Sequence, residues 1–205
     1  VRDEHGAEDG NSSTLRDGTA AGNAIVINIL GTNDAPTITQ NAWNGQSGST
    51  ALSATLTEAS DSTAQSSVTG TIIGHDVDNG DSLHYGLIQP GSDTMHGKVY
   101  VLLASDGHTL TTTTDASTAA TAKNYVGEFT LTEDADPTKG ASYKFTLYND
   151  SPAVQGMQDG DSQDVSIGLV ARDSFGAYVQ ESVSVTVKGA NDTPVITTAP
   201  TLAAL

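Results

Sequence analysis

Apolar and polar side chains alternate along several short segments of this chain. Every second position is apolar over residues 25–29, 52–56, 99–103, 143–147, 165–171 and 183–187. Because successive side chains of a strand point to opposite faces of a sheet, a period of two predicts half-buried strands. No stretch of comparable length has a sustained helical period. Residues 115–123 fit either a short helix capped by Thr114 or Asp115 or a polar loop.

Turn-forming pairs separate the expected strands. They are Asn79-Gly80, Asp106-Gly107 and Asp159-Gly160. A further strand is expected from Val68 to Ile73. Seven or more short antiparallel strands, each with one apolar face, bury those faces by packing as two sheets. The sequence therefore predicts an all-β fold, an antiparallel β-sandwich.

An internal repeat divides the chain. The segment 24–38 returns as 182–196, so that Gly31 and Gly189 correspond at an offset of 158 residues. This offset predicts the C-terminal strands of a preceding repeat in 1–31, one complete sandwich in 32–190, and a linker with the start of the next repeat in 191–205. Prolines restrict both linkers, at Pro36 and Pro194, so consecutive repeats are expected to follow one another end to end.

The charge balance limits the partners. The chain carries 8 Lys and Arg against 25 Asp and Glu, a net charge of −17. Neutralising phosphates requires clustered basic side chains, so a nucleic-acid partner is not expected, and neither is attraction to an anionic membrane. No apolar run approaches the roughly 20 residues of a membrane span. The absence of cysteine excludes disulfides, thiolate metal sites and a cysteine nucleophile.

A short acidic segment offers candidate metal ligands. Asp76-Val77-Asp78-Asn79-Gly80-Asp81 directly follows the strand expected at 68–73. Ca²⁺ takes 6–8 oxygen ligands from carboxylates, amides and backbone, and this loop supplies several of them. The twelve-residue pattern of an EF-hand, with its terminal Glu, is absent because the twelfth position is Leu87.

Several motifs in a fixed order resemble a known family. They are Gly127–Leu131, Tyr143–Gly156, Val170–Ala177 and the closing Gly189–Pro194. Together they resemble a VCBS-type repeat, a cadherin-like module of large type I secreted (RTX) bacterial surface adhesins. The segments Gly74–Asp78 and Ala171–Gly176 are also similar to the D-x-D and D-x-G motifs of cadherin linkers.

The resemblance implies a fold, a cofactor and a location. The fold is an Ig-like or cadherin-like sandwich within a tandem array, at the bacterial cell surface or outside the cell. Ca²⁺ is the implied cofactor, with ligands at Asn33, Asp34, Asp76, Asp78 and Asp173 in one cluster, and at Glu58, Asn191 and Asp192 toward the next repeat. The expected function is a non-enzymatic, calcium-rigidified extender of a biofilm or cell-surface adhesin. Its partners are the neighbouring repeats, while other domains contact a host or biofilm surface.

Other readings of the same residues stay open. Asp and Asn also cap ordinary turns, which is the expected role of Asp159, Asp161 and Asp164. Extra polar sequence at 39–66 and 90–124 is compatible with a sugar- or peptide-binding module of the same kind of adhesin.

Three further patterns in the sequence bear on function: a set of aromatic residues, a group of carboxylates and a di-alanine motif. The aromatic platforms of such a binding module would be Trp43, Tyr85, Tyr100 and Tyr125, although aromatic residues more often pack in cores. The carboxylates Glu133, Asp134 and Asp136 suggest a glycosidase. Enzymes of that type usually bind sugars on aromatic platforms in a cleft, and because this chain has one Trp and 5% aromatic residues, a glycosidase is not the favoured interpretation. Thr19–Gly22 resembles a di-alanine processing site.

Overall fold

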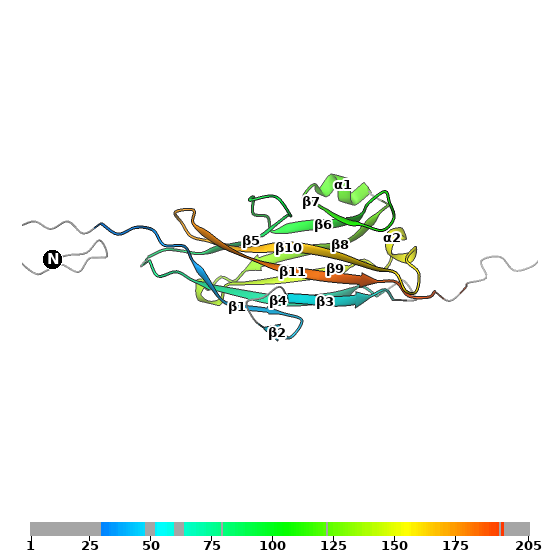
Figure 1. The fold of residues 1–205 in the computed structure, drawn as a ribbon, viewed down its shortest axis with the longest axis horizontal. Coiled ribbons are helices and arrows are strands. Elements are labelled where there is room, and N and C mark those ends of the chain that lie inside the picture. Colours follow the sequence, from blue (N-terminus) through cyan, green and yellow to red (C-terminus); the bar gives the residue numbers. More distant parts are fainter. Residues whose placement is uncertain are drawn as a thin grey trace, which may run out of the picture.

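A computed structural model describes residues 30–47, 52–59, 64–78, 80–121, 123–192 and 194. The strand expected at 25–29, the motif at 19–22 and the start of a following repeat lie outside these residues. The described chain forms two sheets packed face to face and elongated along the strand direction (Figure 1).

In the described residues the larger sheet has the order β2-β1-β4-β9-β8-β6-β7, and the smaller one β3-β11-β10-β5. The larger sheet contains β1 (Thr37–Trp43), β2 (Gln46–Ser47), β4 (Ser66–His75), β6 (Lys98–Leu103), β7 (Leu110–Thr113), β8 (Tyr125–Glu133) and β9 (Ala141–Leu147). The smaller sheet contains β3 (Leu52–Thr57), β5 (His84–Ile88), β10 (Ser162–Arg172) and β11 (Tyr178–Lys188). Three short helical segments connect strands, α1 (Ala116–Thr121), η1 (Pro137–Lys139) and α2 (Pro152–Gln155).

The strand order is that of an immunoglobulin-type sandwich. The neighbours β1-β4-β9-β8 correspond to its A-B-E-D sheet, and β5-β10-β11 to its C-F-G sheet. The predicted all-β sandwich is therefore confirmed. One pair departs from the antiparallel expectation, because β3 runs parallel to β11 from Leu52–Val183 to Thr57–Lys188. The first part of the chain contributes to both sheets, with β1 pairing in the larger one before β3 joins the edge of the smaller one.

The core lies between the sheets and follows the predicted alternation. In β11 the side chains of Val183, Val185 and Val187 are fully buried, whereas the intervening positions are partly exposed. The same pattern holds in β3 and in the first half of β10. Burying a Val, Leu or Ile side chain in this way stabilises the fold by about 1.5–3 kcal/mol.

A polar and aromatic network ties β1 to both sheets. Trp43 stacks on Tyr143 with ring centroids 5.0 Å apart, and its indole N–H donates to the Ser184 carbonyl at 3.2 Å. The Tyr143 hydroxyl donates to Asn41 Oδ1 at 2.6 Å, and Asn41 Nδ2 donates to Glu181 at 2.6 Å. Because Trp43 and Tyr143 are buried with their polar atoms paired, this network fixes how β1 and β9 of one sheet face β11 of the other.

The segments expected as insertions are part of the sandwich. Residues 39–66 include most of β1 and all of β2 and β3, and residues 90–124 supply the β6–β7 hairpin and α1. Of the two alternatives for 115–123, a short helix or a polar loop, the structure has the helix, at Ala116–Thr121. Asp115 caps it by accepting from the Ser117 backbone N–H at 2.9 Å. Hydrogen bonds from the Thr118 and Ser117 hydroxyls and the Ser117 backbone lower the pKa of Asp115 to about 2.

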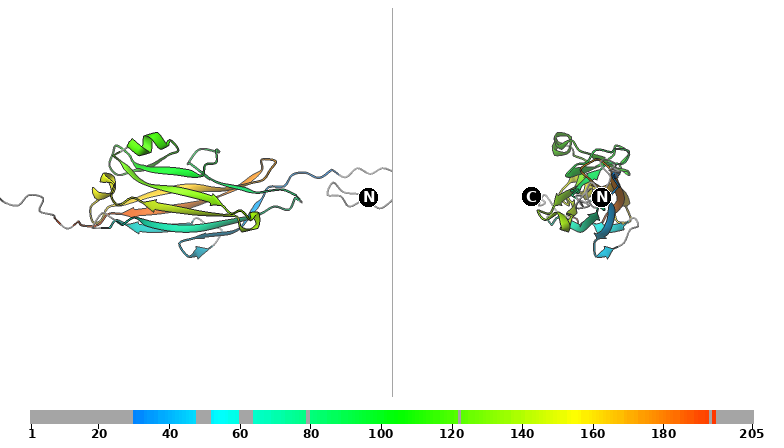
Figure 2. Two further views of the ribbon diagram at one scale, coloured as in Figure 1. Left: turned by 180° about the vertical axis from the view of Figure 1, so that it is seen from behind. Right: turned by 90° about the vertical axis from the view of Figure 1, so that its left-hand side faces the viewer.

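The described chain enters at one end of the sandwich and leaves at the other. The incoming segment, the β4–β5 loop and the β10–β11 turn lie together at one end (Figure 1). The outgoing residues after β11 lie with α2 at the opposite end, as the reverse view also shows (Figure 2). The loops at the incoming end are thus separated from those at the outgoing end by the length of the sandwich.

Candidate metal centre

Three carboxylates converge in the loop between β4 and β5. One carboxylate oxygen of each of Asp76, Asp78 and Asp81 lies within 4.8 Å of the other two. The loop folds back on itself because Asp76 Oδ1 accepts from the Asp78 backbone N–H at 2.8 Å. All three side chains are half-buried, so water screens their repulsion less than on an open surface.

Two carboxylate oxygens of this cluster have no hydrogen-bond partner in the part of the chain that the structure describes. Asp76 Oδ2 and Asp81 Oδ2 are buried without a hydrogen bond among the described residues. Buried carboxylate oxygens ordinarily accept hydrogen bonds or bind a cation. A hard divalent cation prefers such oxygens, so this donor set fits Ca²⁺.

Asp81 was not among the eight residues proposed as ligands from the sequence. The only signal for it was its place in the D-x-D-N-x-D segment, five residues after Asp76. Its Oδ1 accepts from the Ser174 hydroxyl at 3.0 Å, which fastens the β4–β5 loop to the β10–β11 turn. That contact joins residues 93 positions apart in the chain.

The incoming linker contacts the same end of the sandwich. The Asp34 backbone N–H donates to Asp78 Oδ2 at 2.7 Å, and Asn33 Nδ2 donates to Asp173 Oδ2 at 2.9 Å. The structure thus gathers Asn33, Asp34, Asp78 and Asp173 at one end, together with the carboxylates of the loop. The Asp34 contact is made by its backbone N–H, and its side chain stays a predicted ligand.

Asp173 organises the β10–β11 turn. Its Oδ1 accepts from the backbone N–H groups of Phe175, Gly176 and Ala177 at 2.8, 2.6 and 2.9 Å. Burial would raise the pKa of Asp173, but the hydrogen bonds from Asn33 and the turn outweigh it and lower that pKa. Its fixed negative charge faces the linker, and a role as metal ligand remains a prediction.

The other predicted ligands lie at the opposite end. Glu58 is 4% exposed, and its carboxylate accepts from Gln155 Nε2 at 2.9 Å and from the Ala190 backbone N–H at 3.3 Å. Asp192 Oδ1 is buried and has no hydrogen-bond partner in the described part of the chain. Burial raises the pKa of Glu58, the bond from Ala190 opposes that shift, and the charge of Asp192 adds to it. Asn191, next to Asp192 in the chain, is exposed. The carboxylates of Glu58 and Asp192 give the outgoing end its negative charge.

The aromatic residues considered as binding platforms divide into two groups. Trp43 and Tyr85 are 0% and 7% exposed and pack in the core, so they are not surface platforms. Tyr100 and Tyr125 are half-buried on the larger sheet, with centroids 6.1 Å apart and the rings tilted by 58°. Tyr148 lies against Tyr125 at 4.9 Å.

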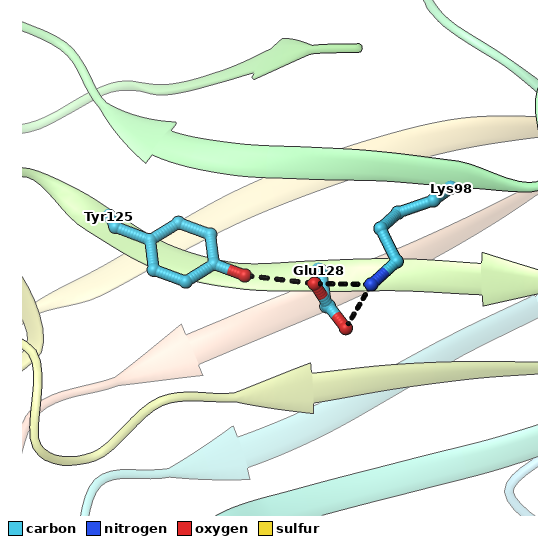
Figure 3. A network of polar contacts seen from close by, with 3 residues as sticks. All are labelled: Lys98, Tyr125 and Glu128. Carbon is cyan, nitrogen blue, oxygen red and sulfur yellow. Dashed lines mark hydrogen bonds and ion pairs between the residues drawn. The ribbon is translucent and has the colours of Figure 1, made fainter. Parts of the chain in front are cut away.

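An ion pair lies beside these tyrosines. Lys98 Nζ is 2.9 and 3.1 Å from the two carboxylate oxygens of Glu128, and the Tyr125 hydroxyl donates to the same carboxylate at 3.1 Å (Figure 3). The hydrogen bond to Glu128 raises the pKa of Lys98. The polar atoms of this group are therefore paired with one another.

Each of the three carboxylates compared with those of a glycosidase accepts a hydrogen bond, and the bonds of Asp134 and Asp136 come from residues two positions away. Glu133 accepts from the Tyr85 backbone N–H at 2.5 Å, Asp134 from the Asp136 backbone N–H at 2.9 Å, and Asp136 from Thr138. The turn interpretation of Asp161 holds as well, since its Oδ2 accepts from the Gln158 backbone N–H at 2.8 Å.

Comparisons with known proteins identify no family for this chain. No protein-family model and no curated protein matches the chain. Among solved structures, the chain is similar to murine CRIg with a TM-score of 0.33 and 11% identity, over 76% of this chain and 98% of that one. Similarity at this level bears on neither family nor function. In the described part of the chain, no helix has the length and apolar character needed to cross a membrane.

Proposed function

We propose that this protein is a calcium-rigidified extender repeat of a large, type I secreted bacterial surface adhesin of the VCBS type. It has no catalytic role and lies outside the cell, with neighbouring repeats of the same chain as its immediate partners. The observation that carries the proposal is the cluster of Asp76, Asp78 and Asp81 at the end where the linker arrives. Two of its buried carboxylate oxygens have no hydrogen-bond partner among the described residues.

The charges explain why a cation is needed. Two unit charges 4.8 Å apart repel by about 1 kcal/mol in water and about 3.5 kcal/mol at an effective dielectric constant near 20. Ca²⁺ bound between the three carboxylates replaces this repulsion with attraction. The Asp34 backbone contact to Asp78 then couples the ordered loop to the linker, which limits the angle between consecutive repeats.

Strand direction supports the extender part of the proposal. The chain enters and leaves at opposite ends, so repeats joined by the short Asn-Asp-x-Pro linkers form a linear array (Figure 1). Glu58, Asn191 and Asp192 at the outgoing end are proposed to contribute to the corresponding site of the next joint. This placement agrees with the 158-residue offset, which aligns Asp34 with Asp192.

Calorimetric titration of the chain with Ca²⁺ tests the proposal. Binding in the range of roughly 10⁻⁴ to 10⁻³ M, typical of extracellular modules, is expected in the wild type. Asp81→Asn should weaken it, while Asp161→Asn, outside the cluster, should leave it unchanged. Absence of Ca²⁺ binding in the wild type would refute the metal-dependent function.

A ligand-binding module of the same adhesin is the second candidate. The observation that favours it is the half-exposed group of Tyr100, Tyr125 and Tyr148 over β6, β8 and the end of β9. A glycan and peptide array separates the two functions. Binding that is lost in Tyr100→Ala would favour the ligand module, and an extender should bind nothing on the array.

A further inference from the structure

The large exposed apolar side chains of the described residues gather at one end of the sandwich. Val77 in the β4–β5 loop is 68% exposed, Phe175 in the β10–β11 turn 76%, and Tyr178 at the start of β11 49%. Leu30, on the incoming segment, is 88% exposed. Single exposed apolar residues are ordinary, but a group confined to one end of an elongated domain indicates an interaction surface.

These side chains sit on loops that are fastened together. The Ser174 hydroxyl donates to Asp81 at 3.0 Å and so links the loop of Val77 to the turn of Phe175. Asp173 holds that turn through three backbone hydrogen bonds. Tyr178 pairs with Arg172 across β10 and β11, and the guanidinium lies 5.3 Å from its ring centroid. We call Val77, Phe175 and Tyr178 the apolar tip. The loop, turn and strand that carry these three side chains are held in place by the hydrogen bonds just described.

The path of the chain shows what can cover the apolar tip. Asn33 is held against Asp173 at 2.9 Å, so the linker runs along this end. Leu30 is three residues earlier, at most about 10 Å away even in a fully extended chain. By the 158-residue offset Leu30 corresponds to Lys188, the last residue of β11. A preceding repeat would thus end its last strand within about 10 Å of Asn33, which is held against the turn that carries Phe175.

We propose that the apolar tip is the docking surface for the preceding repeat of this same chain. The preceding repeat contacts it with its outgoing end, the end at which its last strand leaves the sandwich. The inference rests on the tandem arrangement in the proposed function, but it does not depend on calcium. Because both ends of the sandwich are acidic, charge alone separates neighbouring repeats, and apolar contact supplies an attraction that carboxylates cannot. Calcium and the apolar tip then act on the same joint through different forces.

A tandem protein tests this surface. Residues 30–192 contain a complete sandwich, so two copies of 33–190 can be fused directly. Asn33 of the second copy then follows Ala190 of the first, in the place of Asn191, to which it corresponds at the 158-residue offset. The chain has no cysteine, so Ser166→Cys on the exposed face of β10 gives one label site in each copy. Electron-electron distance measurements then report the joint in Ca²⁺ and in EDTA.

The substitutions Val77→Ser and Phe175→Ser are placed together in either the second or the first copy. In the second copy, whose tip faces the first, we expect the narrow interdomain distance to be lost. The same pair in the first copy, whose tip has no neighbour, is the matched control and should change nothing. Equal distance distributions for the wild type and both variants would overturn the proposal.

Two further measurements separate this inference from its alternatives. Serine at these positions leaves every carboxylate in place, so Ca²⁺ binding measured by calorimetry should be unchanged. A joint that depends on Phe175 in a chain that binds no Ca²⁺ would refute the calcium function and retain the docking surface. The third possibility is that the tip binds a membrane, which is tested by sedimenting the 205-residue chain with phosphatidylserine vesicles. If the wild type sediments with the vesicles and Phe175→Ser does not, while the tandem joint is unaffected by the substitution, the tip binds a membrane instead of a repeat.

Discussion

Replacing EDTA with about 10 mM Ca²⁺ should raise the melting temperature of this protein. Without a cation, the carboxylates of Asp76, Asp78 and Asp81 repel one another within 4.8 Å, and two of their oxygens are buried with no hydrogen-bond partner among the residues that the structure describes. Unfolding separates these charges and exposes the oxygens to water. The folded state therefore gains more from the ion than the unfolded chain does.

The size of the effect follows from linkage. A dissociation constant near 10⁻⁴ M and a hundredfold excess of Ca²⁺ stabilise the folded state by about 2.7 kcal/mol for one site. For a domain of this length, 1 kcal/mol shifts the melting temperature by roughly 2–4 °C. The expected increase is therefore about 5–11 °C. A second ion at Glu58 and Asp192 would add to it.

Thermal unfolding followed by circular dichroism, in EDTA and in Ca²⁺, measures this shift. Asp81→Asn should remove most of it, because it takes away a carboxylate of the three-membered group. Asp161→Asn is the matched control, since the Asp161 carboxylate lies outside the cluster and accepts from the Gln158 backbone N–H, three residues away. Equal melting temperatures with and without Ca²⁺ would refute the reasoning, and a shift that survives in Asp81→Asn would place the ion elsewhere.

Three other expectations come from the same geometry. Asp78→Ala should remove most of the Ca²⁺-dependent shift, whereas Asp34→Ala should remove it only if the Asp34 carboxylate is a ligand, since the observed contact uses its backbone N–H; calorimetry of both variants decides this. The pKa of Glu58 is raised above its ordinary value of 4.5, so its contribution to stability is present below that value and lost as pH rises through the folded pKa; in EDTA, Glu58→Gln should lack this loss in melts recorded from pH 4 to 8. Gly70→Ala should destabilise by about 1–3 kcal/mol in urea unfolding, because overpacking forces shifts; its Cβ would lie 2.3 Å from the Ala42 carbonyl oxygen and 2.4 Å from the Tyr143 ring, and unchanged stability would contradict that contact.

The sequence predicts the strands whose two faces differ most in environment. In β11 and β9 one face meets the other sheet and the other meets water, so the period of two is visible in the residues. The strand β5 escapes this reasoning because Tyr85-Gly86-Leu87-Ile88 is buried on both faces and does not alternate. The strand β1 escapes it because its pairing with β4 shifts register between Ile38 and Gln40, which interrupts the alternation.

The candidate site was predictable only where its ligands are neighbours in sequence. The spacing of Asp76 and Asp78 places both in one loop, and the loop indeed brings them together. Contacts such as Asn33 with Asp173, 140 residues apart, depend on the strand order and could be inferred only through the family resemblance. Burial was equally out of reach, because nothing local distinguishes Trp43 in the core from an exposed aromatic platform.

The two ends of the sandwich pose a single electrostatic problem. The incoming end presents Asp76, Asp78 and Asp81, and the outgoing end presents Glu58 and Asp192, so joining two such repeats brings like charges together. A flexible linker would relieve the repulsion by separation, yet the Asn-Asp-x-Pro linker is too short and too restricted for that. Stable stacking then requires a mobile divalent cation, an apolar contact, or both. Since the first varies with the Ca²⁺ concentration and the second does not, the proposed array, if built on both, would remain connected in low Ca²⁺ and stiffen as Ca²⁺ rises.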